Sequence, residues 1–148
     1  ALMREHAAPV AAALVAEVAK PAKDALTEVV RSADLLSYTA EEGVRRLGEG
    51  KLLLPDSFPG AARSKLCLES KVPLGVVLCV PPFNYPVNLA VSKLGPALIA
   101  GNAVVLKPPT QGAAAALHMV QAFAKAGVPA GVLNAVTGRG AEIGDYMT

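Results

Sequence analysis

An asparagine among prolines, Asn84, is the first residue whose position suggests chemistry. It lies in the stretch VPPFNYPVNLA, residues 80–90, directly after an apolar run typical of a core strand. We therefore expect Asn84 to be buried or nearly so and rigidly held. A rigid amide can donate to a developing oxyanion, which contributes roughly 3–4 kcal/mol to catalysis. The alternative is an Asx-type turn in which the side chain caps its own backbone, and spacing alone favours that interpretation.

A lysine, Lys107, directly follows a second apolar run, and two prolines after it turn the chain out of a sheet. A lysine in this place can reach the ribose or phosphate of a nucleotide as a point charge. Thr110 is predicted to be the N-cap of the next helix, whose N-terminus favours anions. The alternative is a lysine that extends into solvent beside an ordinary helix cap, and both interpretations have equal support.

A glycine-rich turn, Gly138-Arg139-Gly140 with Gly144, is the third candidate. It follows a predicted strand and opens a predicted helix, which is the context of a dinucleotide-binding turn. It is one residue too long for the pattern G-x-G-x-x-G, so by itself it is a weak indication.

Three other polar side chains favour structural roles. His6 and His118 lie in predicted helices without a partner pattern, which favours packing. Arg31 has Glu28 and Asp34 three residues away on either side. We expect it to form an exposed ion pair on a helix, worth roughly a few tenths of a kcal/mol.

The elements that must position these residues change in type along the chain. Residues 1–48 have apolar side chains at helical spacing, and one helix is expected over 2–18. A capping box at 39–42 is expected to mark a break or restart within the second helix. Residues 49–72 are rich in Gly, Pro, Asp and Ser and predict an extended arm or hairpin.

Residues 73–148 alternate between strand and helix. The predicted strands are 75–80, expected to be buried on both faces, 103–108, also expected to be buried, and 131–138. The predicted helices are 87–101 and 110–127, and 139–148 is expected to be a turn into another helix. This order predicts an α/β fold with half of a doubly wound parallel sheet. Ligands of such sheets bind beyond the carboxyl ends of the strands, so the loops 81–86, 107–110 and 138–145 are expected to share one edge.

Composition excludes several classes of protein. With 148 residues, 53% hydrophobic and 18% charged, the chain is long and apolar enough for one domain with a core, or for part of a larger protein. A net charge of +2 with dispersed basic residues and few aromatics argues against nucleic-acid binding. The uncharged run 72–92 contains four prolines and two asparagines, which argues against a membrane span.

Two cysteines, Cys67 and Cys79, lie in apolar surroundings and match no metal-ligand spacing. We expect both to be reduced core residues of an intracellular, cytoplasmic protein without a metal. The chain begins within a helical pattern, does not begin with Met, and ends soon after a glycine-rich turn. We therefore expect both ends to be cut, so that the chain is a piece of a longer protein.

Taken together, the motifs resemble a known family. The stretch PPFNYPVNLAVSKLGPALIAGNAVVLKPPTQ is similar to the aldehyde dehydrogenase superfamily, which has a Pro-x-Asn-x-Pro turn and a strand ending in Lys-Pro. The spacing of 23 residues from Asn84 to Lys107 agrees. KPPTQG, GRGAEIGDY and YTAEEGVR resemble the NADP-dependent, non-phosphorylating glyceraldehyde-3-phosphate dehydrogenase branch, of plant and green-algal type.

The resemblance implies a role for each candidate residue. Asn84 corresponds to the oxyanion-hole asparagine and, with Tyr85, to a substrate-contacting pair. Arg31 corresponds to an arginine that holds the substrate phosphate, which replaces the ion pair expected from spacing. The implied cofactor contacts are Pro81, Lys107, Thr110 and Asp145.

Thr110 also supports a choice of cofactor. NAD-preferring relatives commonly have Glu at this position, where it accepts hydrogen bonds from both ribose hydroxyls. A carboxylate would repel a 2′-phosphate, whereas Thr110 with Lys107 offers a neutral donor and a cation. The resemblance therefore implies NADP as the cofactor.

The implied reaction is oxidation of D-glyceraldehyde 3-phosphate to 3-phosphoglycerate through a cysteine thioester, as a step of glycolysis. The nucleophile and general base are expected beyond residue 148, so this fragment alone is expected to be inactive. The resemblance also implies a homotetramer, with the arm at subunit contacts. The alternatives are a dehydrogenase for a semialdehyde or betaine aldehyde, and a non-catalytic NADP-binding module.

Overall fold

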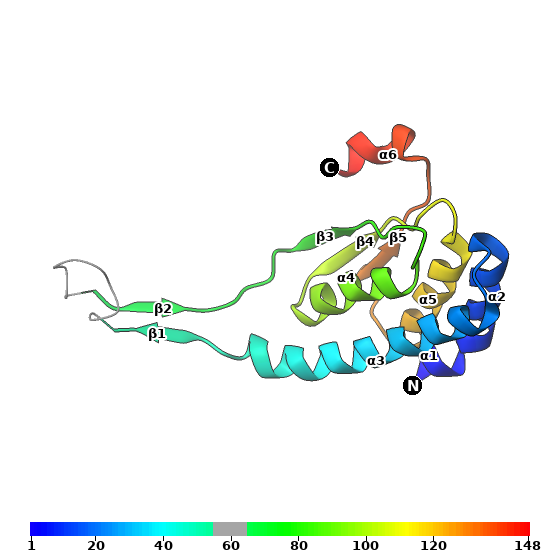
Figure 1. Ribbon diagram of the computed structural model, residues 1–148. Helices are drawn as coiled ribbons and strands as arrows, with labels where there is room; N and C mark the ends of the chain where they lie inside the picture. Colours follow the sequence, from blue (N-terminus) through cyan, green and yellow to red (C-terminus); the bar gives the residue numbers. More distant parts are fainter. Residues whose placement is uncertain (55–64) are drawn as a thin grey trace.

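A three-stranded parallel sheet lies at the centre of the computed structural model, which describes residues 1–54 and 65–148 (Figure 1). The strands β3 (Val76–Cys79), β4 (Ala103–Leu106) and β5 (Leu133–Ala135) pair in that order. Val77 lies opposite Val104, and Val105 lies opposite Asn134. The predicted parallel sheet of an α/β fold is therefore confirmed.

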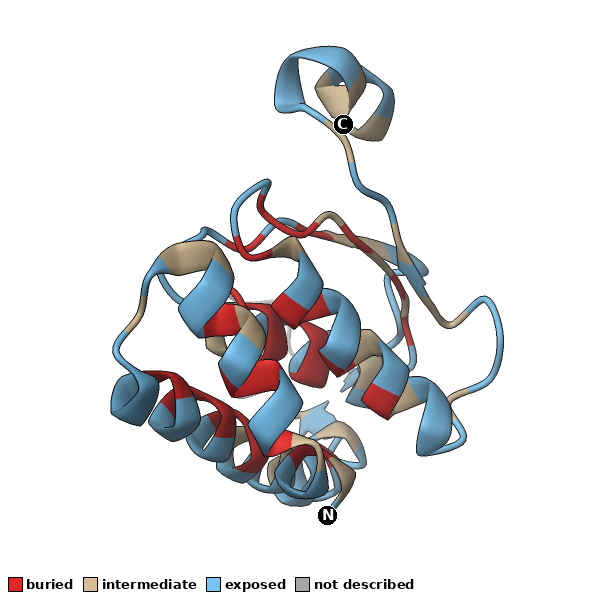
Figure 2. Ribbon diagram, turned by 90° about the vertical axis from the view of Figure 1, so that its right-hand side faces the viewer, coloured by how far each residue is buried: buried red, intermediate tan, exposed pale blue. Residues whose placement is uncertain are grey.

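Two helices connect the strands and cover one face of the sheet. α4 (Asn88–Ile99) joins β3 to β4, and α5 (Ala113–Lys125) joins β4 to β5. Both lie on the same side of the sheet, whereas α6 (Gly140–Met147) lies on the other side, away from the main body (Figures 1 and 2). The order of strands and helices agrees with the alternating pattern expected from residue 73 onward.

Three helices precede the sheet: α1 (Leu2–Glu5), α2 (Ala7–Val18) and α3 (Ala22–Leu47). The prediction of one helix over 2–18 is wrong, because the chain bends at His6, where φ is −94° and ψ is 15°. Pro9 is the physical reason, since it has no N–H to donate to the carbonyl of Glu5 in a continuous helix. The break or restart expected at 39–42 is also wrong, because α3 runs through that segment.

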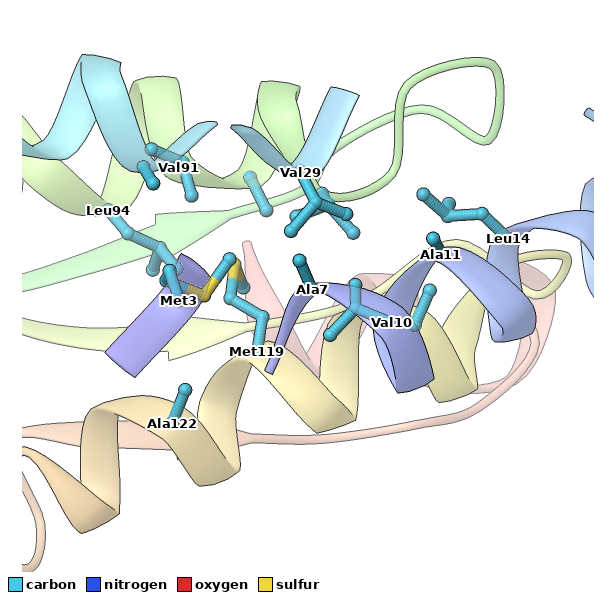
Figure 3. Packing of buried hydrophobic residues seen from close by; sticks show 14 of the residues in the cluster. Met3, Ala7, Val10, Ala11, Leu14, Val29, Val91, Leu94, Met119 and Ala122 are labelled. Atoms are coloured by element: carbon cyan, nitrogen blue, oxygen red, sulfur yellow. The ribbon is translucent and has the colours of Figure 1, made fainter. Parts of the chain in front are cut away.

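The N-terminal helices and the sheet share one hydrophobic core. α2 packs against α3 and α5, and α3 packs against α4. Val10, Leu14 and Val29 from the N-terminal helices are fully buried, as are Leu94 and Met119 from the helices on the sheet (Figure 3). Each such side chain contributes roughly 1.5–3 kcal/mol by burial. The first three helices are therefore bound to the sheet by the same apolar contacts that hold its own helices.

The opposite face of the sheet is only partly covered, so the expectation that the strand at 75–80 is buried on both faces is wrong. Val76 on β3 is 70% exposed. Val105 and Leu78 line a shallow apolar pocket with Tyr146 and Met147 of α6. Within the described residues, α4 and α5 lie on one side of the sheet and no comparable layer lies on the other.

An antiparallel pair, β1 (Lys51–Leu53) and β2 (Cys67–Glu69), extends away from the sheet (Figure 1). It lies within the segment expected to form an arm, part of which falls on residues 55–64, outside the described ranges. Cys67 is half-buried on β2 and is absent from the hydrophobic core. The expectation that both cysteines are core residues is therefore correct for Cys79 and wrong for Cys67.

Two loops at the carboxyl end of the sheet contact each other at a glycine. Gly112 has φ +93°, a conformation that favours glycine, and a Cβ there would lie 2.9 Å from Cγ of Pro86. The loop after β4 can therefore approach the loop after β3 only because residue 112 has no side chain.

Replacing Gly112 by Ala is expected to lower the free energy of unfolding by about 2–4 kcal/mol, since it adds a clash to a strained φ. Gly127→Ala is the matched control, because Gly127 has φ +89° and open space around it. That control should cost only about 1–2 kcal/mol. Urea denaturation of the purified protein measures both, and equal losses would show that the Pro86 contact has no effect.

Cys79 ends β3 in the core, with its Sγ 3.9 Å from the carbonyl oxygen of Ala90. Burial raises the pKa of this thiol from 9.0 to about 11, and the charge of Lys93 opposes the shift only in part. Because the unfolded chain loses this proton first as pH rises, the stabilisation is complete below pH 9 and is lost between pH 9 and about 11.

At pH 8, iodoacetamide is therefore expected to alkylate Cys67 in the native protein and to leave Cys79 unmodified, because the thiolate is the reactive form. Mass spectrometry of peptides after partial labelling measures the two sites separately. Denatured protein, in which both thiols should react, is the control. Equal labelling of both cysteines in the native protein would contradict the raised pKa.

Candidate functional site

The three candidate loops lie side by side at the carboxyl edge of the sheet. The register places Cys79, the last residue of β3, opposite Leu106, the last residue of β4. Lys107 N–H donates to the carbonyl of Cys79 at 2.9 Å, and Val136 N–H donates to the carbonyl of Leu106 at 2.9 Å. The predicted meeting of these loops at one edge is therefore confirmed by the strand register.

Asn84 is exposed in the loop between β3 and α4, so the prediction of a buried amide is wrong. Pro81 and Pro86 on either side of it are buried, and they anchor the loop while its tip projects outward. Within residues 1–54 and 65–148, Asn84 bonds only through its carbonyl oxygen. No Asx-type turn is formed, and the side-chain amide is available to a ligand.

Lys20 holds the backbone of this loop. It lies in the turn between α2 and α3, and its Nζ donates to the carbonyl oxygen of Asn84 at 2.8 Å. The same ammonium forms an ion pair with Glu28 and lies 3.7 Å from the centroid of the Tyr85 ring. Lys20 was not among the residues selected from the sequence, because its partners are distant in the chain.

Glu28 on α3 binds the start of α4. Its Oε1 accepts hydrogen bonds from the backbone N–H groups of Val87, at 3.0 Å, and Asn88, at 3.1 Å. Its side chain is fully buried. A carboxylate is favourable there because the first N–H groups of a helix lack partners within the helix and carry partial positive charge. The periodicity of α3 contains the signal, since Glu28 shares the buried face of Ala25, Val29 and Ser32.

The first turn of α5 is bound in the same way. Glu17 on α2 accepts from Ala114 N–H at 3.0 Å and from Ala115 N–H at 3.1 Å. The N-cap of α5 is Gly112, so the prediction that Thr110 caps this helix is wrong. The N-terminus of this helix does bind an anion, as expected, but the anion is the protein's own Glu17 carboxylate.

Arg31 is exposed on α3, one helical turn after Glu28. Its expected ion pairs are wrong, because Glu28 pairs with Lys20 and Asp34 pairs with Arg4. Across the described ranges, Arg31 forms no ion pair and its guanidinium is free to bind an anion.

A groove of about 260 Å³ lies between the loops that follow β4 and β5. It is lined by Pro108, Pro109, Thr110, Ala113, Thr137, Gly138, Arg139 and Glu142. Thr110 is exposed, while Lys107 is half-buried and donates to the carbonyl of Pro108 at 3.3 Å. The carboxylate in the lining, Glu142, lies 3.9 Å from the guanidinium of Arg139.

The remaining candidates lie around these features. Tyr85 is exposed beside Asn84, and Asp145 is exposed on α6 and does not line the groove. His118 is exposed on α5, so its expected packing role is wrong. His6 is half-buried and contacts the carbonyl of Leu2 and Nζ of Lys125.

The described ranges contain neither a membrane-spanning helix nor a cluster of metal ligands. None of the helices there is both long and apolar enough to cross a membrane. Among the same residues, no group of three or more His, Cys, Asp or Glu side chains has an arrangement that could hold a metal ion.

Comparison with known proteins agrees with this geometry. The chain is 72% identical over 148 residues to the NADP-dependent glyceraldehyde-3-phosphate dehydrogenase of Triticum aestivum, and 70% identical over 148 residues to that of Zea mays. All of this chain is covered in each case, but only 30% of each relative. The chain thus spans about a third of the length of these relatives.

The fold is similar to that of solved enzymes. The crystal structure of NADP-dependent glyceraldehyde-3-phosphate dehydrogenase from Bacillus halodurans, complexed with NADP, superposes with a TM-score of 0.90 at 48% identity. The superposition covers 99% of this chain and 30% of that one. The model of the aldehyde dehydrogenase family matches residues 1–148, the whole chain. The chain therefore belongs to the aldehyde dehydrogenase family.

Proposed function

We propose that the whole protein oxidises D-glyceraldehyde 3-phosphate to 3-phosphoglycerate with NADP and without phosphorylation. One observation carries this proposal: the exposed Asn84 amide stands at the same sheet edge as the groove that contains Thr110. The identity to plant enzymes named NADP-dependent glyceraldehyde-3-phosphate dehydrogenase supports the choice of substrate and cofactor.

Asn84 and Arg31 have the chemistry that this substrate requires. The Asn84 amide can donate to the oxyanion that forms when a nucleophile attacks the aldehyde carbon. The guanidinium of Arg31, which has no ion pair among the described residues, suits a phosphate, to which it can donate two parallel hydrogen bonds. Tyr85 is exposed beside Asn84 and is the second proposed contact with the aldehyde.

The nucleophile is proposed to be a cysteine outside these 148 residues. Cys79 cannot serve, because it is buried and its pKa is raised to about 11. Cys67 lies on the β1–β2 arm rather than at the carboxyl edge of the sheet. Attack by the missing thiolate would give a thiohemiacetal, removal of its hydride would give a thioester, and water would hydrolyse that thioester to the carboxylate product.

The groove fits the adenosine end of NADP by its charge. Thr110 offers a neutral hydroxyl in the lining, and the carboxylate of Glu142 is close to Arg139. Lys107 is not in the lining but donates to the carbonyl of the lining residue Pro108, and is proposed to reach the cofactor from there. Because the carboxylate in the lining is paired with Arg139, the groove has no unpaired carboxylate among its lining residues to repel a 2′-phosphate. Pro81 is proposed to line the cofactor site and Asp145 to contact it. When bound, NADP accepts the hydride that the oxidation removes.

We further propose that the whole protein is a cytoplasmic homotetramer that acts in glycolysis. The β1–β2 arm supports the assembly, because Leu52, Leu66 and Leu68 on or beside its strands are exposed. Light scattering of the full-length protein measures the assembly, and a monomer would overturn it. Fractionation of cells measures the location.

Asn84→Ala in the full-length protein is expected to lower kcat by about 10²- to 10³-fold with little change in KM, because the amide acts on the transition state. Asn84→Asp is the control for shape and should be at least as impaired, since it replaces the donor with an anion. Steady-state reduction of NADP with glyceraldehyde 3-phosphate measures both. If the wild type prefers a semialdehyde or betaine aldehyde, the proposed substrate is wrong. If the wild type binds NADP but oxidises no aldehyde, the protein is a non-catalytic module.

Thr110→Glu is expected to shift preference from NADP to NAD by at least about tenfold in kcat/KM, because a carboxylate repels the 2′-phosphate and can bind ribose hydroxyls. Thr110→Gln has a similar size without the charge and should retain most of the NADP preference. Wild-type enzyme that prefers NAD, or a Glu variant that still prefers NADP, would contradict the assignment.

A further inference from the structure

The ammonium of Lys20 has three contacts, and they account for its three N–H donors. They are the Glu28 carboxylate, the Asn84 carbonyl oxygen at 2.8 Å and the face of the Tyr85 ring, 3.7 Å from its centroid. The side chain is only 11% exposed, although lysine is seldom buried. A desolvated cation with every donor used is held in one place, because moving it would leave a charge unpaired in a poorly hydrated site.

Glu28 extends the same contacts to the other end of the loop. One of its oxygens pairs with Lys20, and the other accepts the N–H groups of Val87 and Asn88. The backbone is therefore bound at residue 84 and again at residues 87 and 88. Pro86, buried between these two points, cannot rotate about φ.

The contact with Asn84 uses the backbone and leaves the side chain free. Lys20 binds the carbonyl oxygen, while the amide bonds to no other described residue. An amide with a fixed backbone and no competing partner is suited to meet a developing charge without reorganisation.

The turn that carries Lys20 is itself strained. Ala19, immediately before it, has φ 53°, the left-handed region that residues other than glycine rarely adopt. Such a conformation persists only where surrounding contacts determine it. The contacts of Lys20 with Glu28, Asn84 and Tyr85 follow this residue in the chain, and those of Glu17 with the start of α5 precede it.

We propose that Lys20 is a positioning residue for the oxidation, which fixes the backbone of Asn84 so that its amide points to the reacting carbonyl. Glu28 holds Lys20 in place and binds the end of the same loop. This inference rests on the proposed function, because it assigns a role within that reaction.

The test uses Lys20→Met together with Glu28→Gln in the full-length enzyme. The pair removes both charges together, so no unpaired charge is left buried, and a Gln oxygen can still accept from Val87 and Asn88. We expect kcat to fall about 10- to 100-fold, the effect of a small misplacement of a reacting group, with KM for the aldehyde changed less than about twofold. If this variant does not fold, Lys20→Gln with Glu28→Gln keeps a neutral contact and gives the same test.

Two single variants are controls. Lys23→Met removes an exposed lysine from α3 and should leave kcat unchanged. Glu28→Gln alone keeps the Lys20 ammonium but removes the ion pair that holds it, so it should also lose activity, with the start of α4 still bound by the Gln oxygen. Loss of activity in Lys23→Met as large as in the pair would show that removing any nearby lysine has this effect, and would overturn a role for Lys20 itself.

A double-mutant cycle separates positioning from general stability. If Lys20 acts through Asn84, the Lys20→Met/Glu28→Gln pair should cause little further loss of kcat in an Asn84→Ala enzyme. Loss of the same factor in both backgrounds would overturn the proposal, as would unchanged kcat in the folded pair.

Amide hydrogen exchange gives a readout apart from activity. The amides of residues 83–88 should exchange faster in the Lys20→Met/Glu28→Gln pair than in the wild type, while those of α5 should be unchanged. Unchanged exchange in residues 83–88 would also overturn the proposal.

The same measurements distinguish the two proposals. Wild-type enzyme without NADP-dependent oxidation of glyceraldehyde 3-phosphate, or full activity in Asn84→Ala, would overturn the proposed function and with it the role of Lys20. Active wild type, impaired Asn84→Ala and an unimpaired pair would overturn only the role of Lys20.

Discussion

The carboxylate of Glu28 is the interaction on which the site depends. It is fully buried on α3, pairs with Lys20, and binds the first N–H groups of α4. Burial of a charge is costly unless it is paired and hydrogen-bonded, and here both conditions are met within one side chain. Because the loop from β3 leads directly into α4, binding the start of that helix also determines where the loop can lie.

Glu17 repeats this arrangement at the neighbouring helix. It reaches from α2 to the first turn of α5, which follows the loop after β4. The helices that follow the first two candidate loops, α4 and α5, are thus bound by carboxylates from the N-terminal helices. The contact of Gly112 with Pro86 then joins one loop to the other. The N-terminal helices are therefore part of the scaffold of the site, and not only a cover for the core.

One face of the parallel sheet carries the hydrophobic core, and the other face is largely exposed within the described residues. The face of the sheet that carries Val76 and Leu78 has little cover within the described residues, and the relatives are about three times as long as this chain. The core on the other face contains side chains from both the N-terminal helices and the α/β segment. A single core of this kind keeps the carboxyl edge of the sheet in place without the second face.

The sequence alone was sufficient for the elements whose signals are local. The strand–helix order, the parallel sheet and the shared edge of the three loops follow from hydrophobic periodicity and short connections, because these features depend on neighbouring residues. The family resemblance likewise followed from short motifs around Asn84 and Lys107. The exposure of Asn84 could not be predicted, because an apolar run shows that a strand is buried but not where the tip of the next loop points.

Only the tertiary structure decided which partner each charge takes. Local spacing paired Arg31 with Glu28 and Asp34, but the fold brings Lys20 and Arg4 to those carboxylates. Local spacing also predicted that Thr110 caps α5, whereas the first turn of that helix is bound by Glu17, which lies 97 residues before Ala114. The physical reason is that ion pairs and helix caps depend on the distance between two groups in space. Folding can make that distance short for residues that are far apart along the chain.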